Sequence, residues 1–151
     1  MTTVNTLDNK ILSICMSVVT PLILIFGFYI QFHGEVSPGG GFQSGIIFTI
    51  PCIVYILLYG NTTKPGYYMI ESSFFKNIGF FGVLLYVFTG IISNILGGNC
   101  FEYNVFNKDN KIAQQIGIFW VETGVCIAVF GGMSTIFLAL YKYILNNNSN
   151  T

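Results

Sequence analysis

The chain has 151 residues, of which 53% are hydrophobic and only 8% charged, whereas charged residues make up about a quarter of a typical soluble domain. Its formal net charge is zero, which excludes the basic surface that nucleic-acid-binding proteins use, so no nucleic-acid partner is expected. The composition therefore indicates an integral membrane protein.

Four apolar stretches are each long enough to cross a hydrocarbon core, which needs roughly 20 residues per helix. They cover residues 11–32, 41–59, 78–96 and 116–143. The connections between them are short, so we predict an all-α protein that forms a single membrane domain, residues 1–151.

Lysines are unevenly distributed between the two ends of these spans. Four lie on the side that holds both termini and two on the other: Lys10, Lys64, Lys76 and Lys142 against Lys108 and Lys111. The positive-inside rule then predicts that both termini are cytoplasmic, in a multi-pass protein of the cell (inner) membrane.

The connection after the first span contains a proline followed by three glycines. Glycines adopt backbone conformations closed to other residues, and their amides can approach another backbone or an ion closely. His33 and Glu35 add two titratable groups at the membrane edge, and a histidine changes charge readily near neutral pH. The turn motif is Ser37, Pro38, Gly39, Gly40, Gly41 and Phe42.

The alternative for this connection is a plain helix break. Ser37 would then cap the second span, and Pro38 would lie in its first turn. His33 is the only histidine of the chain, so it has no second imidazole with which to bind a metal ion.

Small residues recur at helical spacing in the second and fourth spans. Gly41 and Gly45 form a GxxxG pair, and Gly117, Gly124 and Gly131 follow one another at intervals of seven. Small residues allow membrane helices to pack closely. Because a four-helix monomer normally leaves one flank of each helix against lipid, such stripes favour a part of a larger assembly. The alternative is that glycine is simply common in membrane helices.

Glu122 is the only acidic or basic residue deep within a predicted span. A carboxylate inside a membrane is costly unless it is paired, hydrated or protonated. At about 100° per residue, Glu122 points nearly opposite to Gly124. One interpretation is a carboxyl group that handles protons or cations, and the other is a neutral acid hydrogen-bonded across a helix interface.

An enzymatic activity has no support in the sequence. No nucleophile and base are paired, and no cluster of metal ligands is present. We therefore expect a protein that is not an enzyme and that needs neither a cofactor nor a metal ion.

Residues 33–45, HGEVSPGGGFQSG, resemble the signature of the B-type subunit of the Mrp-type multisubunit Na+/H+ (monovalent cation/proton) antiporters. In that family a Gly and a His are commonly followed by a Pro-Gly-Gly-Gly-Phe block. Residues 117–125, GIFWVETGV, are similar to its last helix, which carries a Glu ahead of a Gly. The resemblance extends over nearly the whole chain in length, span count and motif order. One departure is that Glu35 stands where the family has a His after Gly34.

The resemblance implies a small accessory subunit of a heteromeric antiporter complex, beside larger membrane subunits related to those of respiratory complex I. Its partners would be those subunits, monovalent cations, protons and membrane lipid. The chain would support assembly, and Glu122, with His33 and Glu35 as further candidates, would line the ion or proton pathway.

Two other functions remain open from the sequence. One is a structural membrane subunit of a complex I-like or membrane-bound hydrogenase assembly. The other is an autonomous, homodimeric small transporter. Four-helix transporters of that kind carry their glutamate in the first helix, where this chain has none.

Overall fold

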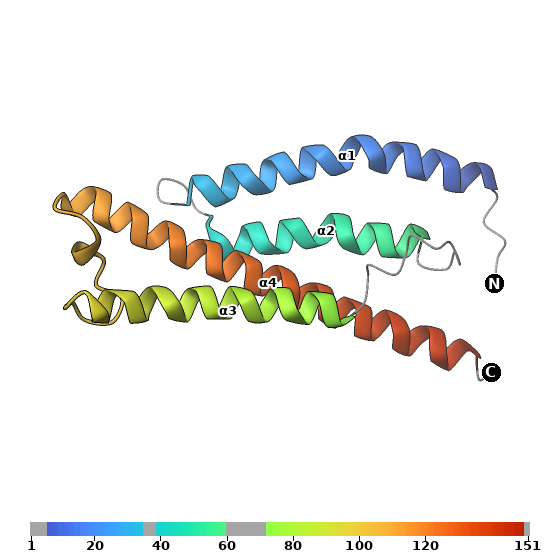
Figure 1. Cartoon of the computed structure of the whole chain (residues 1–151). Helices are drawn as coiled ribbons and strands as arrows, with labels where there is room; N and C mark the ends of the chain where they lie inside the picture. Colours follow the sequence, from blue (N-terminus) through green and yellow to red (C-terminus); the bar gives the residue numbers. More distant parts are fainter. Residues whose placement is uncertain (1–5, 35–38, 60–71, 150–151) are drawn as a thin grey trace.

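The computed structural model describes residues 6–34, 39–59 and 72–149. Within these ranges the regular structure is helical, and four helices are long and apolar enough to cross a membrane. The prediction of an all-α protein with four spans is therefore confirmed. The helices are α1 (Thr6–Phe32), α2 (Gly41–Tyr59), α3 (Ser72–Ile95) and α4 (Asn110–Ser149), with a short 3₁₀ turn, η2 (Tyr103–Phe106), between the last two (Figure 1).

Three of the helices are longer than the apolar runs that predicted them, and α1 begins at Thr6 instead of residue 11. α3 begins at Ser72 instead of residue 78, and α4 runs from Asn110 to Ser149 instead of from 116 to 143. Hydropathy reports only the part of a helix that is apolar, whereas the backbone stays helical through flanking polar residues. At the start of α4 the Asp109 carboxylate accepts a hydrogen bond from the Lys111 amide (3.1 Å), which is a helix cap.

The four helices run side by side, and α4 lies between α2 and α3 (Figure 1). The contact of α4 with α3 is the most extensive, its contact with α2 is next, and α1 packs mainly on α2. The start of α1 and the end of α4 lie at one end of the bundle, and the α1–α2 and α3–α4 connections lie at the other (Figure 1). α3 and α4 extend beyond the α1–α2 connection.

α1 is the least buried of the four spans. Only 6% of its apolar window is buried within the chain, against 22–28% for the other three. Its exposed side chains are large and apolar, and include Ile11, Ile14, Val18, Leu22 and Ile25. This face of the chain is suited to lipid or to another membrane protein.

Glycines on both helices bring α3 and α4 into backbone contact. Gly124 lies against Gly82 and Tyr86, and Gly131 lies against Gly79. At Gly124 and Gly131 the glycine stripe of α4 is thus filled by α3 of the same chain, and not by a foreign protein as the sequence argument favoured. In a membrane, hydrophobicity gives a helix little preference for another helix over a lipid tail. Close approach of this kind stabilises the helix pair by raising its packing density.

A second set of glycines joins α2 to α4. The backbone of Gly41 lies against that of Glu122, and Gly45 lies against the Cys126 carbonyl. Farther along the pair, near the end that holds the termini, Ile56 and Leu138 bury their side chains together with Phe75 of α3. The helices α2 and α3 are therefore both held against α4 as a central helix.

The packing makes opposite predictions for two adjacent glycines of α4. An ideal Cβ on Gly131 would lie 2.6 Å from both the Phe75 carbonyl oxygen and the Gly79 Cα, whereas one on Gly132 would meet nothing within 4 Å. We expect Gly131→Ala to force α3 away from α4 at a cost of about 1–3 kcal/mol. Gly132→Ala should be neutral or stabilising by up to about 1 kcal/mol, because alanine favours helix.

Thermal unfolding of the detergent-solubilised protein measures this difference. Gly131→Ala should melt several degrees below the parent protein, and Gly132→Ala at or above it. Equal melting temperatures for the two variants would mean that the α3–α4 backbone contact does not stabilise the fold.

Candidate functional site

The Glu122 carboxylate of α4 lies against the connection between α1 and α2. An ideal Cβ on Gly34 would be 2.6 Å from Glu122 Oε2, and one on Gly40 would be 2.9 Å from Oε1. The backbone of Gly41 touches the Glu122 carbonyl group. The structure thus brings together the two features that the sequence singled out separately, the glycine turn and the membrane carboxylate.

Gly40 meets two requirements that only glycine satisfies together. Its φ is +116°, a conformation that residues with a Cβ rarely adopt. A side chain there would also collide with the Glu122 carboxylate. Gly97, at the end of α3, has a φ of +90° but faces open space, so it meets only the first requirement.

Two helix ends meet at the carboxylate. α1 ends at Phe32 and α2 begins at Gly41, so the last carbonyl groups of one helix and the first amide groups of the other, which lack partners within their own helices, lie on either side of the turn. The first end carries partial negative charge and the second partial positive charge. Membrane transporters use similar breaks between helices to bind ions with backbone groups.

Glu122 lies at the same level along the bundle as this turn. Its position in the sequence of α4 alone does not reveal that level. The apolar window of α4 covers 35 residues, well above the roughly 20 that cross a bilayer core, so distance along α4 does not give depth in the membrane. The apolar window of α1 ends at Phe32, and the apolar window of α2 begins at Gly41. The carboxylate therefore lies near one end of the first two spans, beside the part of α3 and α4 that extends farther.

His33 packs against Tyr29 of α1. Its ring stacks on Tyr29, with ring centroids 4.3 Å apart, and its Nδ1 lies 3.1 Å from the Tyr29 carbonyl oxygen. Gly39 packs against Ile30, and Phe42 is 60% exposed. Glu35, Ser37 and Pro38 lie outside the described residues, so the roles expected of them stay predictions.

A polar pair behind the turn was not recognised as part of a site from the sequence. Ser44 donates a hydrogen bond to the Gln31 side-chain carbonyl (2.5 Å), and both residues are buried. The pair ties the end of α1 to the start of α2. The available signal was the presence of a polar side chain on each side of the turn, Gln31 and Ser44, within largely apolar spans.

The third glycine of the α4 stripe belongs to the other connection. Gly117 packs against the ring of Tyr103 in η2. Partial burial raises the pKa of the Tyr103 phenol, and the nearby Tyr86 and Cys100 raise it further. Tyr103 is therefore a neutral packing residue at physiological pH, outside the membrane spans. In the part of the chain that the structure describes, no three His, Cys, Asp or Glu side chains gather as metal ligands.

Comparison with known proteins gives consistent similarities over most of the chain. Residues 11–135 match the family described as "Domain related to MnhB subunit of Na+/H+ antiporter". The putative antiporter subunit mnhB2 of Staphylococcus haemolyticus (strain JCSC1435) is 27% identical over 136 residues, which cover 88% of this chain and 94% of that protein.

Two further relatives have the same extent of similarity. The B-type Na(+)/H(+) antiporter subunit of Bacillus subtilis (strain 168) is 26% identical over 132 residues, covering 81% of this chain and 90% of that protein. The putative antiporter subunit mnhB2 of Staphylococcus aureus (strain Newman) is 28% identical over 136 residues, with coverages of 88% and 94%. With its four membrane-spanning helices and its glycine turn, this chain belongs to the family related to the MnhB subunit of multisubunit Na+/H+ antiporters.

Proposed function

We propose that this chain lines the ion or proton pathway of a heteromeric monovalent-cation/proton antiporter through Glu122 and the α1–α2 turn, and that it also supports assembly of the complex. The family and the names of its relatives support the antiporter. The observation that carries the pathway role is the close approach of Gly34, Gly40 and Gly41 to Glu122.

A carboxylate in this position suits an exchange of protons for cations. A bare charge near the membrane core is unfavourable, and either a bound proton or a bound monovalent cation neutralises it. The two therefore compete for the same group, which is the minimum that antiport requires. The turn adds backbone groups at a place where side chains have no room, so a small ion could exchange with little rearrangement.

Assembly of the antiporter complex would use the outer surface of the helix bundle. The exposed apolar face of α1 would contact lipid or the other membrane subunits of the complex. The start of α1 and the end of α4 lie at one end of the bundle, and the lysine distribution supports a cytoplasmic location for that end in the inner cell membrane.

Removing the charge of Glu122 tests the pathway role. Glu122→Gln keeps the shape of the side chain but cannot exchange a proton, so we expect cation-driven proton movement in inverted vesicles of the complex to fall at least about tenfold, or about 1.4 kcal/mol in the transport barrier. Native mass measurement should show the complex intact. Glu102→Gln is the matched control, because Glu102 bonds only to Asn99 among the described contacts outside the spans.

Normal exchange by the Glu122→Gln complex would remove this residue from the pathway. It would favour the alternative that Glu122 is a neutral interface bond in a structural subunit, which the tight fit between α4 and the turn also supports. A homodimer without larger subunits in the native mass measurement would instead favour an autonomous transporter.

The fit of the turn to the carboxylate makes a second prediction. Gly40→Ala combines backbone strain, about 1–2 kcal/mol for a left-handed residue, with a collision at Glu122 Oε1. Gly97→Ala has only the strain, since its Cβ would meet nothing within 4 Å. We expect Gly40→Ala to impair transport strongly and Gly97→Ala to retain it.

The measurement is the transport assay at matched amounts of assembled complex. Equal transport by the two alanine variants would show that the close fit of the turn to Glu122 is not needed for exchange.

A further inference from the structure

Ser44 of α2 lies directly behind the glycine turn, and its side chain is completely buried, with 0% of its surface exposed. Its backbone amide donates a hydrogen bond to the Gly40 carbonyl (3.1 Å), and its hydroxyl bonds to the Gly41 carbonyl (3.0 Å). Both glycines lie against Glu122. A single residue therefore fixes the orientation of two carbonyl groups of the turn at the site.

The same hydroxyl joins the turn to α1. Ser44 Oγ lies 2.5 Å from the side-chain amide oxygen of Gln31, which is 7% exposed. A hydroxyl has one hydrogen to donate and two lone pairs that accept. With the Gln31 amide turned over, its nitrogen donates to Ser44 while the Ser44 hydrogen stays on Gly41. The Gln31 nitrogen, which otherwise lacks a partner, is then paired, and one hydroxyl holds both groups.

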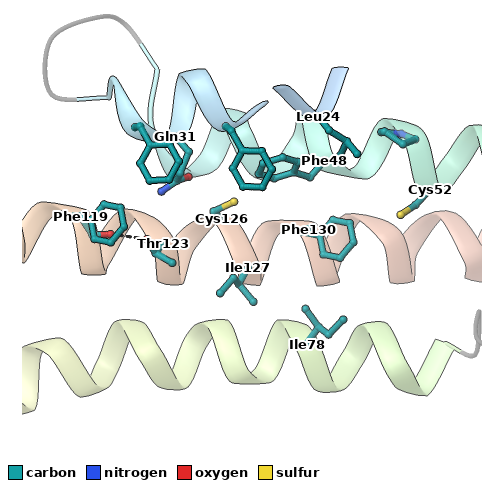
Figure 2. A pocket seen from close by; sticks show the side chains of 13 residues that line it. Leu24, Gln31, Phe48, Cys52, Ile78, Phe119, Thr123, Cys126, Ile127 and Phe130 are labelled. Carbon is teal, nitrogen blue, oxygen red and sulfur yellow. Dashed lines mark hydrogen bonds between the residues drawn. The ribbon is translucent and has the colours of Figure 1, made fainter. Parts of the chain in front are cut away.

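A third contact connects Ser44 to α4. The Cys126 thiol forms a hydrogen bond with the Ser44 side chain. Cys126 follows Glu122 by four residues, so the two lie on one face of α4, about one helical turn apart. Figure 2 shows Gln31 extending from α1 toward α4, where Cys126 lies. Ser44 is thus the point at which α1, α2 and α4 are joined behind the carboxylate.

We propose that Ser44 is a positioning residue of the exchange site, which holds the backbone of Gly40 and Gly41 in place so that a monovalent cation at Glu122 meets a fixed turn. This proposal rests on the pathway role proposed above for Glu122. Glycines allow the close approach of the turn, but they also have the greatest backbone freedom of all residues. A binding site made of them therefore needs a residue that holds them, and Ser44 bonds to both.

Other buried hydroxyl groups of the described residues lack these connections. Thr49, also on α2 and 2% exposed, bonds to the Gly45 carbonyl of its own helix (2.9 Å). Ser134 of α4 is 1% exposed, and its hydroxyl has no hydrogen bond. Burial of a hydroxyl in this bundle thus does not by itself require a bond between helices, and the contacts of Ser44 with α1 and α4 call for a role at the place where they meet.

The test measures sodium-driven proton movement in inverted vesicles of the whole complex, over a range of sodium concentrations. Ser44→Ala releases the turn, so we expect the apparent KM for sodium to rise about two- to tenfold, the loss expected for one hydrogen bond. The maximal rate per assembled complex should change by less than about twofold, because Glu122 and its proton remain. Ser134→Ala is the matched control and should keep both values, since Ser134 lies about 18 Å from Glu122 along α4.

A second variant keeps the test decisive if Ser44→Ala prevents assembly, which native mass measurement reports. Gln31→Met keeps the size of the side chain but removes one bond to the hydroxyl, so it should also raise the KM for sodium. Adding Gln31→Met to Ser44→Ala should have no further effect, because Gln31 acts through the hydroxyl. Effects that multiply in the double variant would overturn the proposal.

A merely structural role of Ser44 would give a different result. Loss of packing alone would lower the amount of complex or its maximal rate and leave the KM for sodium unchanged, and that outcome would overturn the proposal. Glu122→Gln in the same assay separates the two claims. If it stops exchange while Ser44→Ala leaves the KM unchanged, only the positioning role fails. If Glu122→Gln exchanges normally, the pathway role fails and the positioning role fails with it.

Discussion

Backbone contact with α4 is the constraint on which the rest of the structure depends. Glycines remove the side chains that would otherwise separate the helices, on the α3 side at Gly79, Gly82 and Gly131 and on the α2 side at Gly41 and Gly45. In a membrane this matters more than in water, because burial of apolar surface gives little gain over contact with lipid tails. The central helix can therefore present Glu122 at one precise level, where the turn meets it.

The carboxylate site follows from that arrangement. A single glycine turn both links two spans and packs against the Glu122 carboxylate on a third helix. The same turn that lets α2 approach α4 brings the backbone of Gly34 and Gly40 close to the carboxylate. Because the turn has both roles, it needs several glycines in succession, whereas a plain helix break needs only one glycine at a position with positive φ.

The bundle is tight on one side and loose on the other. α2, α3 and α4 share close contacts and a small buried cluster at Ile56, Phe75 and Leu138, while α1 is held by α2 and by the Gln31–Ser44 hydrogen bond.

The number of spans, their approximate bounds and the glycine and glutamate motifs were predictable from the sequence, because crossing a hydrocarbon core demands a length of apolar residues that can be counted. Helix ends at Ser72 and Asn110 were missed, since helical backbone continues where hydropathy falls. Only the tertiary structure decided that Glu122 lies level with the turn, and that α3 fills the glycine stripe of α4 at Gly124 and Gly131. The stagger of helices and the residues that meet across them depend on contacts between distant segments, which no count along the chain contains.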